Sequence, residues 1–159
     1  MNYAGVLPGW YILLTGSGEK SLSSPTVFAG MVLFTTYTPP PSAAATCYSS
    51  GTGKMYAMAM MPMVINGVLF NTGAGLWADG ARSISLGSGV PTSPIISQKP
   101  REKPGATDVF VTISGGGGTD TVIKSLAELT EQKDSPARAR FGETPPQAQI
   151  THWRDRRLQ

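Results

Sequence analysis

The chain has 159 residues, of which only 14% are charged against roughly 25% in an average soluble domain, and it carries 19 glycines and 13 prolines. Because Gly and Pro mark turns rather than extend helices, this composition favours short strands with many turns and argues against a helical bundle. The net charge of +3 comes largely from C-terminal arginines without a base-stacking aromatic pattern beside them, so we expect no nucleic-acid binding.

The first third of the chain reads as three strands. Residues 9–14 (GWYILL) form an aromatic and aliphatic run that ends at the polar turn 15–20 (TGSGEK), which predicts a strand. Two further runs, 25–29 and 31–38, are rich in residues that fit a pleated surface. They predict a hairpin with a tight turn near Ala29-Gly30.

The middle of the chain alternates loops and strands. Prolines at 39–41 end the hairpin because they cannot donate to a strand ladder, and small polar residues at 42–53 predict a loop. Residues 54–61 (KMYAMAMM) are apolar on both faces, which predicts a strand covered on both sides or, as the alternative, a buried helical turn. A weaker strand at 64–70 is split by Asn66-Gly67, a dipeptide suited to a tight hairpin turn.

A loop is expected at 71–80, followed by a strand at 82–86 (RSISL), whose alternation suggests one face in water. Residues 93–97 and 108–114 then repeat the earlier theme of Ser-Pro and apolar runs. The charged, Pro-rich segment 98–107 between them is predicted to be a loop.

The C-terminal part is less regular. Four apolar residues at helical spacing predict an amphipathic helix over 121–133, with a strand as the competing interpretation. Residues 134–147 resemble a linker, and 149–154 (QITHWR) predict a last short strand. We therefore expect two parts, a β-rich body at 1–133 and, at 134–159, a linker with a basic C-terminal strand or tail that packs on it.

Roughly nine short strands at regular spacing are typical of a sandwich, a barrel or a propeller. The repeated Ser-Pro pattern favours the propeller, whose blades reuse one strand pattern. The predicted fold is thus all-β, a partial β-propeller of about two blades of antiparallel strands. Two blades without their neighbours leave strand edges uncovered, so completion by another chain or a missing N-terminal part is expected.

Two glycine motifs resemble nucleotide-binding loops. Gly73, Gly75 and Ala78 have the spacing of a dinucleotide loop, but no acidic residue ends a strand about 20 positions on, so a structural turn is the preferred interpretation. Residues 51–55 (GTGKM) resemble a phosphate loop, but Met55 replaces the magnesium-binding hydroxyl. Neither motif predicts a cofactor.

Catalytic and metal-binding residues are also not indicated. His152 is the only histidine, which excludes a metal site with two imidazoles within this chain. Cys47 is the only cysteine, either an unpaired thiol or half of a bridge to a partner chain. Asp79, Asp108 and Asp120 stand alone rather than at calcium-loop spacing. We expect no enzyme activity, no cofactor and no metal.

Methionine and tryptophan are assigned to packing. Five methionines lie within nine residues, namely Met55, Met58, Met60, Met61 and Met63. We expect them to fill an irregular core rather than to bind copper or a partner. Trp10, Trp77 and Trp153 are expected to anchor the layers of the fold. No apolar run reaches the roughly 18 residues of a membrane-spanning helix, and residues 6–14, broken by a Pro-Gly pair, do not resemble a signal peptide.

The order of these motifs resembles one protein family. GWYILL, GEKSLSSPTVFAGMVLFTTYTP, a small-residue loop with Cys47, GKMYAMAM, SLGSGVPTSPII, DVFVTISGGGG and THWRD are similar to the C-terminal β-propeller region of the PilY family, the type IV pilus biogenesis and tip-adhesin proteins. The likeness spans about residues 9–155 and is most specific at 18–39. Family proteins are far longer, so the chain resembles only their tail.

The resemblance implies an extracellular, pilus-associated protein without enzymatic activity that promotes pilus assembly and surface attachment. Its partners would be minor pilins or the missing propeller portion, its ligand a host or abiotic surface, and export would depend on a larger precursor or partner. Loops 39–53 and 98–107 are the expected contact regions. The family's calcium-binding loop has no counterpart here, and its usual Tyr-Ala-Leu-Asp appears as residues 56–59, Tyr-Ala-Met-Ala.

Two other functions remain as alternatives. One is a fragment of a quinoprotein-like propeller enzyme that binds a redox cofactor, although acidic calcium and quinone ligands are not evident in the sequence. The other is a sugar-binding, lectin-like domain, for which Trp77 beside Asp79 is the sequence signal.

Overall fold

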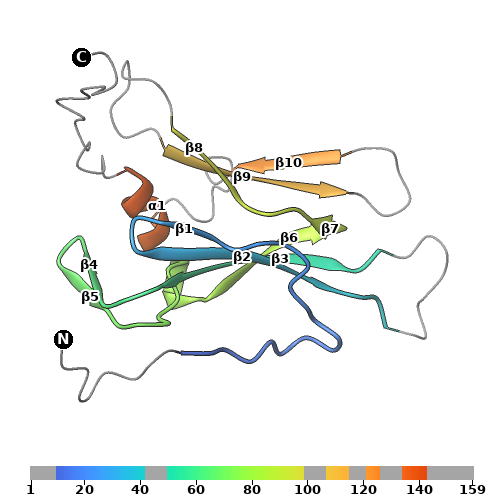
Figure 1. The fold of residues 1–159 in the computed structure, drawn as a ribbon, viewed down its shortest axis with the longest axis horizontal. Coiled ribbons are helices and arrows are strands. Elements are labelled where there is room, and N and C mark those ends of the chain that lie inside the picture. Colours follow the sequence, from blue (N-terminus) through green and yellow to red (C-terminus); the bar gives the residue numbers. More distant parts are fainter. Residues whose placement is uncertain (1–9, 42–49, 99–106, 115–120, 126–133, 143–159) are drawn as a thin grey trace, which may run out of the picture.

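The computed structural model describes residues 10–41, 50–98, 107–114, 121–125 and 134–142. These residues form antiparallel β-sheets with one short α-helix (Figure 1). The all-β class predicted from the sequence is confirmed.

The first sheet has the strand order β1-β2-β3-β6. Its strands are β1 (Thr26–Phe28), β2 (Met31–Thr38), β3 (Thr52–Ala59) and β6 (Ser83–Ser88). β2 and β3 pair over their full length, from Met31 opposite Ala59 to Thr38 opposite Thr52. The turn from β1 to β2 has φ of 49° at Ala29 and 82° at Gly30, two successive positive values of the kind that tight hairpins require. The predicted hairpin is therefore present.

A small hairpin stands between β3 and β6. It pairs β4 (Met63–Ile65) with β5 (Val68–Phe70) through Asn66-Gly67, which again have positive φ, and this confirms the predicted turn. The chain then returns to the edge of β3, where Gly75 bridges Met58, and passes through the short 3-10 helix Ala78–Gly80. β6 continues along the same edge.

The second sheet is built around β9 (Thr107–Ser114). On one side β9 pairs with β10 (Thr121–Ser125). On its other side it pairs with β7 (Val90–Pro91) and β8 (Ile95–Gln98), which follow one another along the same edge. All of these pairs are antiparallel, and two of them skip strands in the chain, because β6 pairs with β3 and β7 pairs with β9.

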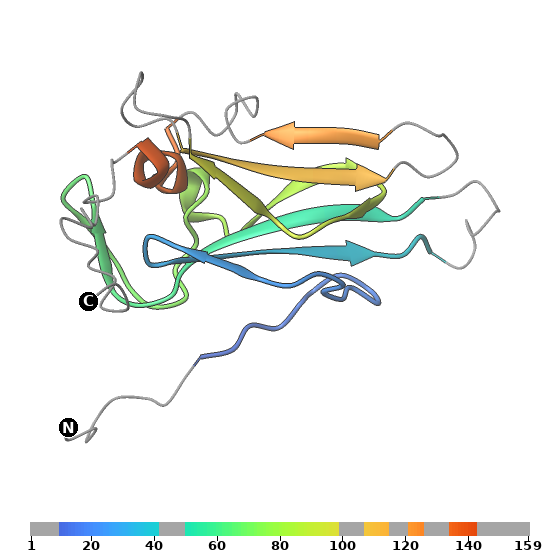
Figure 2. The same cartoon turned by 45° about the horizontal axis from the view of Figure 1, so that its top comes forward.

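The two sheets lie one above the other and share a single core (Figures 1 and 2). Alternate residues of β2, β3 and β9 supply much of this core, namely Met31, Leu33, Met55, Ala57, Ala59, Val109, Val111 and Ile113. The helix α1 (Pro136–Gly142) packs at one end, with Ala137 fully buried and its N–H donating to the carbonyl of Leu76 at 2.8 Å. Burial of these apolar side chains provides the main stabilisation of the fold.

Three predictions of secondary structure were wrong. Residues 10–14 carry the strand-like pattern but lie outside any strand, because none of the described strands pairs with them. The helix predicted over 121–133 is replaced at Thr121–Ser125 by β10, since pairing with β9 overrides a helical spacing that rests on few residues. The expected linker at 134–147 contains α1, whose side-chain burial gives a short helix the tertiary support it needs.

Some predicted elements cannot be compared with the structure. Residues 126–133 of the predicted helix and the predicted strand 149–154 lie outside the described residues. The strand predicted over 54–61 is confirmed as β3, which begins at Thr52 and ends at Ala59.

Two tryptophans provide a matched test of packing. Trp77 is fully buried and its indole N–H donates to the carbonyl of Met55 at 3.1 Å, whereas Trp10 is 37% exposed and donates to the carbonyl of Met60 at 3.3 Å. We expect Trp77→Phe to lower the free energy of unfolding by about 1–3 kcal/mol, because a buried carbonyl loses its donor. Trp10→Phe leaves a carbonyl that water can reach, and should cost less than about 1 kcal/mol. Equal losses in chemical denaturation of the two variants would contradict this account.

Candidate functional site

A buried carboxylate is the main polar centre of the described residues. Glu19 ends a tight turn in which its backbone N–H donates to the carbonyl of Gly16 at 3.0 Å, while the N–H of Gly16 donates to Glu19 Oε2 at 2.8 Å. Gly18 has φ of 69°, which suits glycine, and a Cβ at Gly16 would lie 2.7 Å from Glu19 Oε2. The polar sequence TGSGEK therefore forms the predicted turn and aims its carboxylate at the first sheet.

Three side chains of the first sheet donate to this carboxylate. Glu19 Oε1 accepts from Thr36 Oγ1 at 2.6 Å and from the Tyr56 hydroxyl at 2.9 Å, and Oε2 accepts from Lys54 Nζ at 3.1 Å. The Glu19 side chain is 0% exposed and that of Lys54 is 29% exposed. A buried charge is tolerated when it is paired and hydrogen-bonded, and both conditions hold here.

The environment fixes the protonation states of this cluster. Burial by itself raises the pKa of Glu19, but the hydrogen bonds from Thr36, Gly16, Tyr56 and Lys54 together hold the pKa below its ordinary value. Burial, and then the hydrogen bond to Glu19 and its charge, raise the pKa of Tyr56 to about 12. At neutral pH the carboxylate is thus ionised and the phenol remains a donor.

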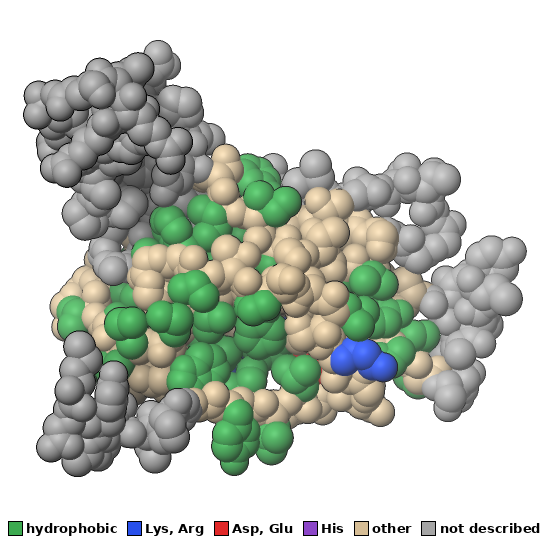
Figure 3. Space-filling model, in the orientation of Figure 1, with side chains coloured by type: hydrophobic (Ala, Val, Ile, Leu, Met, Phe, Trp, Pro, Cys, Tyr) green, Lys and Arg blue, Asp and Glu red, His purple; other side chains and the backbone are tan. Residues whose placement is uncertain are grey.

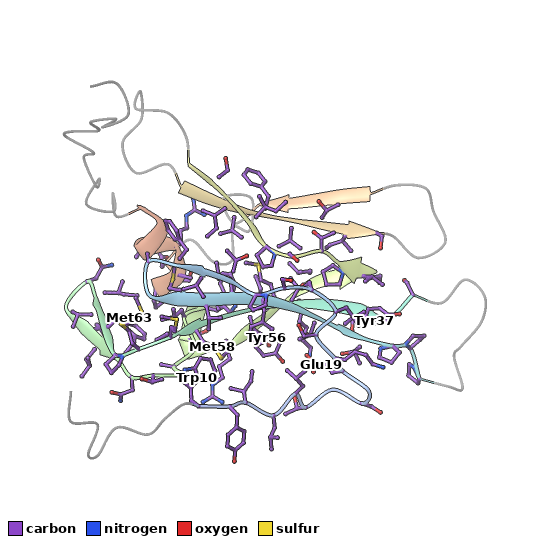
Figure 4. All side chains as sticks on the ribbon, viewed as in Figure 1. Trp10, Glu19, Tyr37, Tyr56, Met58 and Met63 are labelled. Carbon is purple, nitrogen blue, oxygen red and sulfur yellow. The ribbon has the colours of Figure 1, made fainter. Side chains whose placement is uncertain are left out.

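The cluster connects the N-terminal segment to the first sheet rather than presenting a reactive group. Glu19 already accepts four hydrogen bonds, so its lone pairs are used within the protein. The ring of Tyr56 stacks on Phe34, with centroids 4.7 Å apart and planes 6° apart, which fixes the phenol. Figure 4 shows Glu19 and Trp10 on the face of the first sheet that points away from the second sheet.

Sequence reasoning did not identify this centre. The TGSGEK turn was recognised, but the three side-chain donors to Glu19 lie 17, 35 and 37 positions further along the chain. They share one face of the first sheet because Thr36 pairs with Lys54, and Tyr56 follows two residues later. The polar residues Thr36 and Lys54, on strands that are otherwise rich in apolar residues, are the signal that could have indicated a buried acidic partner.

We expect Glu19→Gln to lower the free energy of unfolding by about 1–3 kcal/mol, because an amide cannot accept all four hydrogen bonds and leaves Lys54 without its counter-charge. Urea denaturation followed by circular dichroism measures the change. Asp79→Asn makes the same chemical replacement at an exposed position and should change stability by less than about 0.5 kcal/mol. A Glu19→Gln protein as stable as wild type would show that the cluster contributes nothing.

The lowered pKa of Glu19 also predicts how stability depends on pH. A carboxylate whose folded-state pKa lies below its unfolded value of about 4.5 stabilises the fold fully above that value. This contribution is lost as the pH falls through the lower folded-state pKa. Wild type should therefore lose more stability than Glu19→Gln between pH 6 and about pH 3. Parallel stability profiles for the two proteins would contradict the assignment.

The glycine motif at 73–78 forms the structural turn that the sequence favoured. Gly75 lies where a Cβ would overlap the carbonyl oxygens of Gly80 and Ala81, so close backbone packing explains this glycine. The three-residue 3-10 helix that follows gives no α-helical N-terminus for a pyrophosphate. In the second motif, Gly53 and Lys54 belong to β3 rather than to a phosphate loop, and Lys54 is paired with Glu19.

The methionine cluster divides into two groups. Met55, Met58 and Met63 are buried, which confirms the packing assignment for these three. Met60 and Met61 are 36% and 50% exposed, so that assignment was wrong for them, because β3 ends at Ala59 and the chain leaves the core there. Trp77 is fully buried, which confirms the packing assignment for this residue. Trp10 is exposed and lies over Gly73 on the outer face of the first sheet, so the prediction that it anchors the two layers was wrong. Trp153 lies outside the described residues.

The described strand ends beside the two predicted contact loops lie at opposite ends of the molecule. The ends of β2 and β3 that flank residues 42–49 lie at one end of the molecule, and the ends of β8 and β9 that flank residues 99–106 lie at the other (Figure 1). Cys47 and His152 lie outside the described residues. Within the described part of the chain, His, Cys, Asp and Glu do not gather in groups of three that could hold a metal ion.

An exposed apolar surface lies on the β4–β5 hairpin and the segment before it. We call it the hairpin surface and define it as Met60, Met61, Val64 and Leu69. Val68 is also exposed, but it pairs with Ile65 and lies on the other face of the hairpin. Val64 and Leu69 are directly opposite each other and are 57% and 63% exposed, while Met63 and Ile65 on the other face are buried. The sequence carries no charged residue from Met55 to Ala78. Exposed apolar clusters of this kind mark interaction sites in folded proteins.

Figure 3 shows that apolar side chains gather across the middle of one face of the described molecule, among polar side chains and backbone, with Lys or Arg atoms toward the lower right. Among the helices of the described residues, none is long and apolar enough to cross a membrane. Comparison with protein-family models, curated proteins and solved structures gave no match.

Proposed function

We propose that this chain is a non-enzymatic structural and adhesive module of a type IV pilus tip or biogenesis protein, which promotes pilus assembly and surface attachment. The observation that carries the proposal is the hairpin surface, an uncharged apolar cluster that projects from the sheets. A protein of this kind acts by shape and contact, because burial of such apolar side chains against a partner is favourable.

The arrangement of the strands supports the proposal of a partial β-propeller. Propeller blades are four-stranded antiparallel sheets, and the first sheet has four strands in chain order with the β4–β5 hairpin inserted before the last one. β9 and β10 with the β7–β8 edge give a second sheet that packs on the first. We infer that these are two blades, which a missing propeller portion or minor pilins complete, in an extracellular protein exported with a larger precursor or partner.

The other functions considered gain no support. Trp77 is fully buried and cannot stack on a sugar, which removes the sequence signal for a lectin-like domain. A quinoprotein-like enzyme needs acidic ligands for calcium, whereas the oxygens of Glu19 are occupied by protein donors. The resemblance to the pilus family and the hairpin surface together favour the adhesive module.

The test uses the source organism with its own copy of the coding sequence deleted. Complementation with the wild-type chain should restore surface pili and attachment to abiotic surfaces, and an epitope tag should be found in the sheared pilus fraction. The double variant Val64→Lys, Leu69→Lys should reduce attachment severalfold, since it places two charges on the hairpin surface. The matched control is Leu22→Lys, Ile95→Lys, which changes two side chains of similar exposure elsewhere and should behave as wild type.

A deletion strain with normal piliation and attachment, or a tagged chain absent from the pilus fraction, would contradict the pilus proposal. An attachment defect of equal size in both double variants would contradict the role of the hairpin surface. Circular dichroism of each purified variant separates loss of a contact from loss of the fold.

A further inference from the structure

The N-terminal arm, residues 10–15, has the character of a β-strand that lacks its partner. Tyr11 and Leu13 are 86% and 80% exposed. Ile12, which lies between them, and Leu14, which follows Leu13, are half-buried. This alternation is the period of two that defines a strand with one face covered. The sequence predicted a strand at this place for the same reason.

The arm is held at its ends and open along its middle. At one end the Trp10 indole donates to the carbonyl of Met60, and at the other the Gly16–Glu19 turn fixes the chain on the first sheet. Between them, the backbone of residues 11–14 makes no hydrogen bond to any described residue. Unpaired backbone groups on an extended apolar segment are a template for pairing with another strand.

We propose that the N-terminal arms of two copies of this chain pair as antiparallel strands about a two-fold axis near Ile12. In this register Tyr11 of one protomer faces Leu13 of the other, and the reverse pair follows from the symmetry. Aromatic and aliphatic side chains directly opposite each other stabilise an antiparallel pair. The inference does not depend on the pilus role.

The charge pattern favours a second copy as the occupant. The sequence carries no charged side chain from Met1 to Gly18, so an antiparallel pair centred at Ile12 places no like charges opposite each other over its whole length. The surface that the arm offers is therefore complementary to itself, which is the requirement for a two-fold interface. A charged partner strand would meet an apolar face instead and lose its hydration.

The size of the contact sets the expected affinity. Two large side chains and a few backbone groups from each protomer bury less than the roughly 800 Å² per partner of a standard interface. The dimer should therefore be weak, with a dissociation constant in the micromolar range or above, and it should form in a concentration-dependent way.

The experiment compares two double variants of the purified chain by sedimentation velocity over a wide concentration range. In the proposed register, Tyr11→Glu with Leu13→Glu sets carboxylates opposite each other and should raise the dissociation constant at least tenfold. Tyr11→Lys with Leu13→Glu sets opposite charges face to face and should retain dimerisation near the wild-type level. The control Leu22→Glu, Ile95→Glu places the same charges on side chains of similar exposure outside the arm and the hairpin surface, and should leave the dimer intact.

A wild-type chain that stays monomeric at every concentration would overturn the proposal. Equal loss of dimer in both arm variants would overturn the antiparallel register, and loss in the Leu22, Ile95 control alone would place the interface elsewhere. Circular dichroism verifies that each variant is folded. Because dimerisation is measured on purified protein, failure here is distinct from failure of the pilus experiment.

Discussion

The pairing of β2 with β3 is the constraint on which the rest of the structure depends. Eight residues of each strand are in register, so every second residue faces the second sheet and the others face away from it, on the side where Glu19 lies. Met31, Leu33 and Ala57 point into the shared core, whereas Thr36 and Tyr56 meet Glu19 on the opposite face. A slip of one residue would exchange these faces and bury the polar side chains in the core.

The features that the sequence predicted well are local. The turns at Ala29-Gly30 and Asn66-Gly67 follow from the few residues that accept positive φ, and the strands beside them follow from their apolar runs. The features that it missed depend on partners distant in the sequence. The arm at residues 10–14 has the pattern of a strand, but a strand also needs a neighbour, and β10 formed where β9 supplied one.

The candidate site could not be predicted for the same reason, because it depends on contacts between residues distant in the sequence. Glu19 looked like part of a solvated turn because its surroundings in the sequence are small and polar. Its burial follows from the register of β2 and β3, which only the folded structure reveals. The exposed methionines show the reverse case, since an apolar run of the sequence continues beyond the point where the strand ends. The spacing of apolar residues predicts which side chains share one face of a strand. It does not predict which other part of the protein packs on that face.

Among the described residues, a buried ionic cluster is combined with exposed apolar side chains. The ionic cluster is turned inward, where its members satisfy one another, and the hairpin surface and the N-terminal arm carry apolar side chains outward. Recognition by such surfaces relies on fit and on release of water rather than on electrostatic steering, so it should depend little on ionic strength.

The docking of α1 has a consequence for synthesis of the protein on the ribosome. Ala137 closes the core against Leu76, yet it leaves the ribosome long after Leu76 and Trp77 have been made. At translation rates of about 5–20 residues per second this interval lasts roughly 3–12 seconds, during which that end of the nascent core has no cover. Cells that make this chain therefore have a reason to shield it with chaperones until α1 has emerged.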